Sequence, residues 1–273
     1  MPITLAYKYV ATAVILMQIN HYASRMHLPI SLPITEEDIR KQSMSPPEVL
    51  GVTGGIDTDR YFFSVAGKPK YRGGPNWSTS GRLMFVINTA HPYYALKSGS
   101  EEKNDYFRGL TNEKANITKD SAYQMATNWL SGLDVDVQRL NQEHSSSVEQ
   151  WKWQERFPMP LFEVKWMKDW DFGNGRIMNM PLISVLIDGR SGELVHLRQE
   201  DDSYSLQPSR LINNLDKLLA ITDDQFLKFT PELRSKLVME FAVAQPWATR
   251  PATETAGQGS PAHPATTDHS AQQ

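Results

Sequence analysis

Ile183-Ser184-Val185-Leu186-Ile187-Asp188-Gly189-Arg190-Ser191-Gly192-Glu193-Leu194-Val195-His196-Leu197 is the stretch that decides the fold. A nearly continuous apolar run leads into a polar turn with two glycines, and a second apolar run follows the turn. This pattern predicts two antiparallel strands joined by a tight turn, with the first strand in the interior of a sheet. Gly189 and Gly192 suit the positive φ angles that such turns need.

Two further strands are expected before this pair, at residues 148–153 and 161–166. Trp151 and Trp153 fall on one face of the first strand, because successive side chains of a strand alternate. Apolar and charged residues alternate along the second strand, which is typical of a strand with one buried face. A glycine-containing turn is expected at residues 169–175. The four strands together predict an antiparallel sheet.

An amphipathic helix is expected just before this sheet. It begins near Thr118, and its apolar residues recur at helical spacing as Ala122, Met125, Ala126, Trp129, Leu130 and Leu133. Residues 117–197 are therefore predicted to form one helix packed on a small antiparallel sheet. The fold class that follows is α+β, with helices on one face of the sheet.

Changes in composition along the chain predict five segments. These are an N-terminal hydrophobic segment at 1–26, an α+β unit at 27–115, a second α+β unit at 116–206, a C-terminal helical extension at 207–244 and a disordered tail at 245–273. In the first unit, strands near 61–65 and 81–88 form an extended hairpin around a loop at 67–80. The first unit repeats the element order of the second, which suggests two diverged copies.

The N-terminal segment has two interpretations. A positive residue, Lys8, precedes a short apolar run, and Ser24 offers a small residue for cleavage, as in a secretory signal peptide. This interpretation favours an exported protein, periplasmic or extracellular, with at most peripheral membrane contact, since the run is too short to cross a bilayer. The alternative is an ordinary N-terminal helix docked on the domain, which is compatible with a cytoplasmic protein.

Composition excludes several functional classes. The chain has 273 residues and a net charge of −3, and it contains no cysteine. Nucleic-acid binding is not expected, because it requires a surplus of positive charge. The lack of cysteine excludes disulfides, thiolate nucleophiles and thiolate metal sites.

Three stretches resemble the PepSY domain. They are the helix Asp120-Ser121-Ala122-Tyr123-Gln124-Met125-Ala126, the strand Phe162-Glu163-Val164-Lys165-Trp166 and the hairpin at 183–194 with its Gly-Glu ending. PepSY-like modules are small α+β units of exported bacterial proteins, associated with protease propeptides and peptidase regulation. The resemblance covers about residues 117–200. It implies a non-catalytic exported module that binds a peptide or protein, or that regulates a peptidase.

Few residues are arranged for catalysis. The seven histidines show no pair at i, i+4 spacing, so neither a metal site nor another cofactor is expected. The acidic run Glu200-Asp201-Asp202 lies near His196 and suggests a hydrolase as an alternative function. Such runs are more often solvated surface residues, so an enzyme is not favoured.

The candidate binding residues are aromatic: Trp151, Trp153, Trp166 and Trp170. A sheet face with several tryptophans can bind a peptide or a sugar by stacking. The alternative is that these side chains form the core under the helix. A peptide or protein partner is expected to bind by strand addition at a sheet edge or by contact with the aromatic face. A structural cell-envelope protein is the other alternative, and it predicts no pocket or groove.

Overall fold

The computed structural model describes residues 2–44, 54–65, 82–153, 157–208 and 210–245. The predicted loop at 67–80 and the predicted tail, apart from Gln245, lie outside these residues. All the elements named below lie within the compact unit Met1–Val243.

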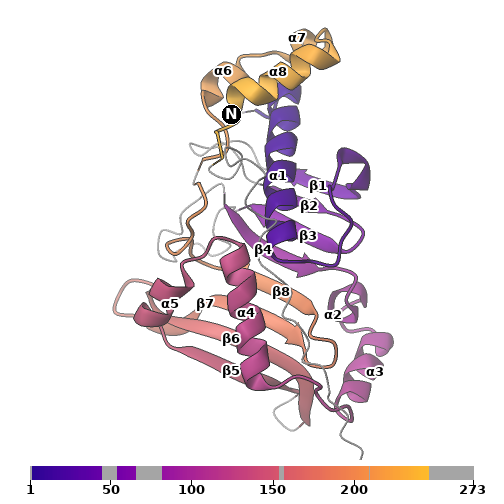
Figure 1. Ribbon diagram of the computed structural model, residues 1–273, viewed down its shortest axis with the longest axis vertical. Coiled ribbons are helices and arrows are strands. Elements are labelled where there is room, and N and C mark those ends of the chain that lie inside the picture. Colours follow the sequence, from indigo (N-terminus) through magenta and orange to yellow (C-terminus); the bar gives the residue numbers. More distant parts are fainter. Residues whose placement is uncertain (1, 45–53, 66–81, 154–156, 209, 246–273) are drawn as a thin grey trace, which may run out of the picture. The chain divides into compact units, whose positions relative to one another are not determined.

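A single antiparallel sheet of eight strands organises the fold (Figure 1). Its order is β1-β2-β3-β4-β8-β7-β6-β5, which leaves β1 and β5 at the two edges. The strands are β1 (Lys41–Met44), β2 (Gly54–Asp57), β3 (Tyr61–Val65), β4 (Leu83–Asn88), β5 (Ser146–Trp153), β6 (Phe157–Asp171), β7 (Ile177–Asp188) and β8 (Leu194–Gln199). The predicted α+β class is confirmed, and β7 lies in the sheet interior as its apolar run indicated.

The sheet is built from two units with the same order of elements. Helix α1 (Leu5–Arg25) precedes β1–β4, and helix α4 (Lys119–Gly132) precedes β5–β8. The units join where the last strand of each meets the other, with Val86 of β4 opposite Leu197 of β8. Both helices contribute to one hydrophobic core on the same face of the sheet. Each unit thus consists of a helix followed by four antiparallel strands.

Helix α4 follows the predicted apolar stripe. Thr118 caps it by accepting a 3.1 Å hydrogen bond from the backbone N–H of Ser121. Ala122, Ala126 and Leu130 are buried against the sheet. A short helix, α5 (Val137–Glu143), continues the chain toward β5.

Helix α1 is part of the core. Its buried residues are Ala6, Tyr7, Val10, Ala11, Thr12, Val14, Ile15, Leu16, Gln18, Ile19, Tyr22 and Ala23. This helix covers β1–β4 as α4 covers β5–β8 (Figure 1). The structure therefore places the segment suggested as a signal peptide in the position of a docked helix. Among the described residues, no helix is both long and apolar enough to cross a membrane.

Helices also cover the opposite face of the sheet. The short helix α2 (Pro92–Ala95) and helix α3 (Glu101–Leu110) pack there over β6–β8. They form a second, smaller core with Leu161, Leu186 and Val195. Strands β6–β8 are therefore buried on both faces. The sequence predicted helices on one face only, and the structure adds α2 and α3 on the other.

The C-terminal extension is helical, as predicted. It contains α6 (Leu215–Leu219), α7 (Asp223–Leu227) and α8 (Pro231–Phe241), and a 3-10 turn at Glu36–Asp38 completes the helical elements of the described chain. Asp223 accepts a 2.8 Å hydrogen bond from the backbone N–H of Leu5, and Phe226 packs on Tyr9. These contacts fix the extension to the beginning of α1.

Candidate binding site

A pocket of about 480 Å³ lies between helix α3 and strand β5. It is lined by Tyr93, Ser98, Gly99, Lys103, Asn104, Phe107, Trp151, Lys152, Trp153 and Met159. Strand β5 is an edge strand, and none of its residues is buried. The pocket thus adjoins the end of a strand that has an unpaired side in the described sheet.

An irregularity in the sheet aims the two tryptophans of β5 at this pocket. Gln150 pairs with Phe162, and the next pair is Lys152 with Pro158. Trp151 therefore lies opposite three residues of β6, which form a bulge. Pro158 borders this bulge and Pro160 lies within it, and neither has a backbone N–H to donate to the ladder. Bulges of this kind change the direction of side chains at the edges of sheets.

Aromatic rings form the inner wall of the pocket. The ring of Tyr93 lies 5.3 Å from Trp151 and 6.1 Å from Phe107, both edge-on. The indole N–H of Trp151 donates a 3.3 Å hydrogen bond to Glu163. These contacts hold the rings in place while Trp151 and Trp153 remain partly exposed. A rigid, partly exposed aromatic wall is suited to burying an apolar group of a ligand.

The charged residues that the structure describes in the pocket lining are both lysines. Lys103 and Lys152 line it, and none of its ten lining residues is an aspartate or glutamate. The ammonium of Lys103 donates to the backbone carbonyl of Tyr93 and lies 5.0 Å from the centre of the Tyr93 ring. The site therefore offers positive charge beside apolar surface.

The four predicted tryptophans divide between the two faces of the sheet. Trp166 is fully buried in the core shared with α4, where its indole N–H donates a 2.7 Å hydrogen bond to Asn141. Trp170 is also buried, with its indole N–H on the carbonyl of Met180. Neither side chain has surface left for a ligand. Only Trp151 and Trp153 line the pocket, so the candidate site is restricted to this pair.

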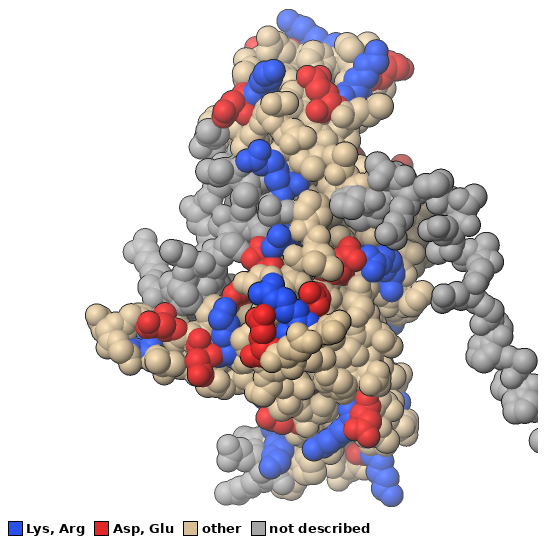
Figure 2. Space-filling model, turned by 60° about the vertical axis from the view of Figure 1, so that its left-hand side comes forward, with Lys and Arg blue, Asp and Glu red and all other residues tan. Residues whose placement is uncertain are grey.

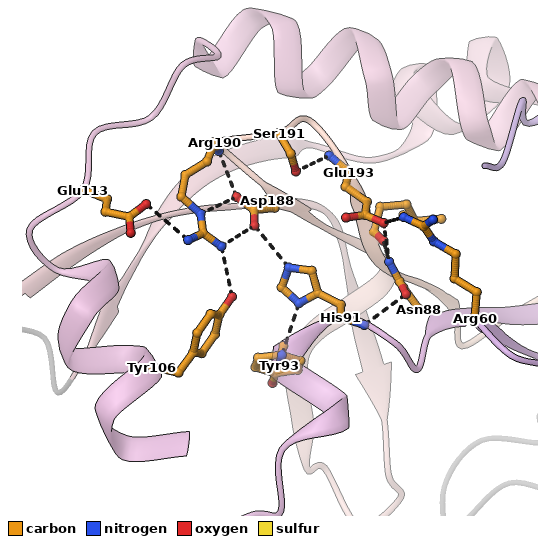
Figure 3. Close-up of polar contacts among 11 residues, drawn as sticks. Arg60, Asn88, His91, Tyr93, Tyr106, Glu113, Asp188, Arg190, Ser191 and Glu193 are labelled. Carbon is orange, nitrogen blue, oxygen red and sulfur yellow. Dashed lines mark hydrogen bonds and ion pairs between the residues drawn. The ribbon is translucent and has the colours of Figure 1, made fainter. Parts of the chain in front are cut away.

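A buried polar cluster anchors α2 and α3 beside the pocket (Figure 3). The Nε2 atom of His91 lies 3.1 Å from the carboxylate of Asp188, and its Nδ1 atom accepts a hydrogen bond from the backbone N–H of Tyr93. Arg190 binds the same carboxylate through Nε and Nη2, at 3.0 and 2.7 Å, and it also donates to Tyr106 of α3. The turn after β7 thereby holds both pocket-lining helices.

The same turn also joins the two units of the sheet. Glu193 accepts a hydrogen bond of 2.8 Å from Asn88 at the end of β4 and forms an ion pair with Arg60 (Figure 3). The side chains of the Asp188–Glu193 turn therefore bind residues of the first unit as well as shaping the hairpin.

Asp188 is ionised in the folded protein. Burial by itself raises the pKa of this carboxyl, but the hydrogen bonds from His91 and Arg190 outweigh burial and hold its pKa well below the ordinary range. The carboxylate is only 4% exposed, so its charge is compensated by these partners rather than by water. Removal of the carboxylate would deprive Arg190 and His91 of their shared hydrogen-bond acceptor.

His196 is a second buried histidine near the site. Its Nδ1 atom lies 2.8 Å from the hydroxyl of Tyr94, which also accepts a hydrogen bond from Arg198. Burial, and then the positive charge of Arg198, lower the pKa of His196 to about 3. The ring is therefore neutral at physiological pH.

The buried neutral His196 predicts a loss of stability in mild acid. The unfolded chain takes up a proton near pH 6.5, while the folded protein does so only near pH 3, so stability falls as pH drops through this window. Between pH 7 and pH 5 we expect a loss of about 2 kcal/mol from this group.

Urea denaturation at both pH values should show that His196→Asn loses less stability than the wild-type protein. His27→Asn, at an exposed histidine, serves as the control. If the free energy of unfolding depends equally on pH in all three proteins, His196 does not have the lowered pKa that this prediction requires.

The acidic run suggested for hydrolysis binds other residues. Asp201 forms a 2.7 Å ion pair with Lys168, and Asp202 pairs with Arg82 at 3.1 Å. His196 contacts Tyr94 instead. His196 lies within β8, whereas Asp201 and Asp202 follow the end of that strand at Gln199. The geometry does not favour the hydrolase alternative.

Within the ranges that the structure describes, no group of three or more histidine, cysteine, aspartate or glutamate side chains is placed to hold a metal ion. On the face drawn in Figure 2, positive and negative side chains are interspersed rather than gathered into an area of one sign. Comparison with protein-family models, curated proteins and solved structures found no match to this chain.

Sequence reasoning identified Trp151 and Trp153 but missed the other walls of the pocket. Tyr93, Lys103 and Phe107 come from short helices whose position on the far face is fixed by His91 and Asp188, 97 residues apart. One local signal was present. Pro158 and Pro160 in an otherwise strand-like stretch indicate a bulge or an edge.

Proposed function

We propose that this protein is a non-catalytic module that binds an extended peptide or a segment of a partner protein along β5 and in the adjoining pocket. The observation that carries the proposal is the aromatic pocket at the end of an edge strand. Strand addition supplies backbone hydrogen bonds, and an adjacent pocket supplies side-chain specificity.

The regular part of β5 provides the edge for such pairing. From Ser146 to Gln150 the strand pairs residue by residue with β6, and its other side has no neighbouring strand in the described sheet. The bulge interrupts the ladder after Gln150, where the pocket begins. A peptide beside Ser146–Gln150 would therefore meet Trp151 and Trp153 at the end of its paired segment.

The resemblance to PepSY modules agrees with this proposal. Helix α4 followed by antiparallel strands, and the Gly-Glu ending of the β7–β8 turn, have the expected order. On the basis of this resemblance alone, we extend the proposal to an exported protein, periplasmic or extracellular, that regulates a peptidase or another partner. Because α1 belongs to the core, we propose that it is retained in the mature protein. The pocket also favours binding over a purely structural envelope role.

Peptide binding can be tested with a synthetic library of random peptides, each made with a free C-terminal carboxylate and as a C-terminal amide. We expect selected peptides to shift the tryptophan fluorescence of the wild-type protein. Trp153→Ala should weaken their affinity at least about tenfold, as for an aromatic anchor of an interface.

The control is Trp129→Ala, which removes a partly exposed tryptophan that packs against the α1–α4 core. This variant should bind the selected peptides as the wild-type protein does. If no peptide of either series binds, or if Trp153→Ala binds with unchanged affinity, the proposed function is wrong.

A further inference from the structure

The chemistry of the pocket points to a narrower class of ligand. We propose that it takes the C-terminal carboxylate of a peptide whose last side chain is apolar or aromatic, an inference that rests on the proposed function. Among the described residues, the lining of the pocket combines two lysines with an aromatic wall and includes no aspartate or glutamate. Such a site is complementary to a negative charge carried beside an apolar group.

The two lysines lie on different walls. Lys103 belongs to the first turns of α3, and Lys152 belongs to β5. The bond to the carbonyl of Tyr93 fixes the ammonium of Lys103 and uses one of its three donors. The remaining donors are available to a carboxylate. Lys152 is exposed and can approach the same ligand from the sheet edge.

The apolar surface of the pocket comes from three different elements. Phe107 comes from α3, Met159 from the bulge of β6, and Trp151 from β5. The volume of about 480 Å³ is near the lower end of the range for ligand pockets, which suits one large residue rather than a long segment.

A chain terminus fits this arrangement better than an acidic side chain. The last residue of a peptide carries its carboxylate and its own side chain on one carbon atom, so one residue engages the lysines and the aromatic wall together. An aspartate or glutamate in the pocket would meet the lysines but would leave the rings of Trp151 and Phe107 without an apolar partner. Because β5 runs from Ser146 toward Trp153, a peptide that pairs parallel to β5 would bring its C-terminal end to the pocket beyond Gln150.

The paired peptide library separates this inference from the proposed function. For the peptides that bind best, the free acid should bind about tenfold more tightly than the amide. Lys103→Gln and Lys152→Gln should each weaken binding of the free acid severalfold and leave binding of the amide nearly unchanged. Lys97→Gln is the matched control, because Lys97 is exposed near the pocket but does not line it.

Equal affinities for acid and amide would overturn carboxylate recognition while leaving peptide binding intact. Tight binding of amides that carry an internal aspartate or glutamate would overturn it as well, since the charge would then come from a side chain. Failure of both series to bind would overturn the proposed function and this inference together.

Discussion

Deletion of residues 2–25 is expected to prevent the protein from folding. The deletion removes α1, which has twelve buried residues and covers β1–β4. Burial of a large apolar side chain contributes about 1.5–3 kcal/mol, while whole domains are stable by only about 5–15 kcal/mol. Circular dichroism and urea denaturation of residues 26–273 should show no cooperative transition.

Two point variants test the same burial in the intact chain. Ile15 is 1% exposed and Met17 is 39% exposed on the same helix. Ile15→Ala should lower the free energy of unfolding by about 2–5 kcal/mol, and Met17→Ala by much less. A truncated chain that folds cooperatively with a native spectrum would contradict the role of α1 and would allow cleavage after Ser24.

Asp188→Asn is expected to lower the free energy of unfolding by about 3 kcal/mol, because it breaks a buried ion pair and leaves the partner charge of Arg190 behind. The matched control is Asp105→Asn, which removes an exposed ion pair with Arg108 and should cost less than about 1 kcal/mol. Urea denaturation of the two variants at pH 7 measures the difference.

The pH dependence gives this prediction a second signature. Because the pKa of Asp188 is depressed in the folded state, its stabilisation is present above the ordinary aspartate range and is lost only as pH falls toward the depressed value. The gap between wild type and Asp188→Asn should therefore persist down to about pH 4 and close in stronger acid. A loss below 1 kcal/mol at pH 7 would show that the cluster does not hold α2 and α3.

Local pattern predicted much of the second unit. The stripe of α4, the apolar run of β7 and the turn at 188–192 each reflect short-range periodicity or backbone constraint, and each is found in the structure. Within the turn, Gly192 has the expected positive φ of 73°, whereas Gly189 does not have a positive φ. The turn predicted at 169–175 is shorter than expected, because β6 and β7 continue to pair as far as Asp171 and Ile177. The residues at the end of this hairpin are mostly polar, so the sequence pattern does not distinguish the ends of the two strands from a turn.

The remaining features depend on contacts between distant residues. The sequence near Lys8 has the same short apolar run whether it forms a signal peptide or a core helix, and only packing against β1–β4 distinguishes the two. Trp151 and Trp166 both lie in strand-like stretches of sequence. Because of the bulge and of the different helices on the two faces of the sheet, Trp151 lines the pocket and Trp166 lies in the core. The pairing of His91 with Asp188 has no local signal at all.

Hydrogen exchange of the β5 backbone amides, measured with and without a saturating selected peptide, tests the central claim most directly. We predict slower exchange at alternate amides of Ser146–Gln150 together with protection around Lys103 and Phe107 of α3. The other edge strand of the described sheet, β1 (Lys41–Met44), should exchange as before. Unchanged exchange along β5, or protection confined to β1, would contradict peptide binding at this site.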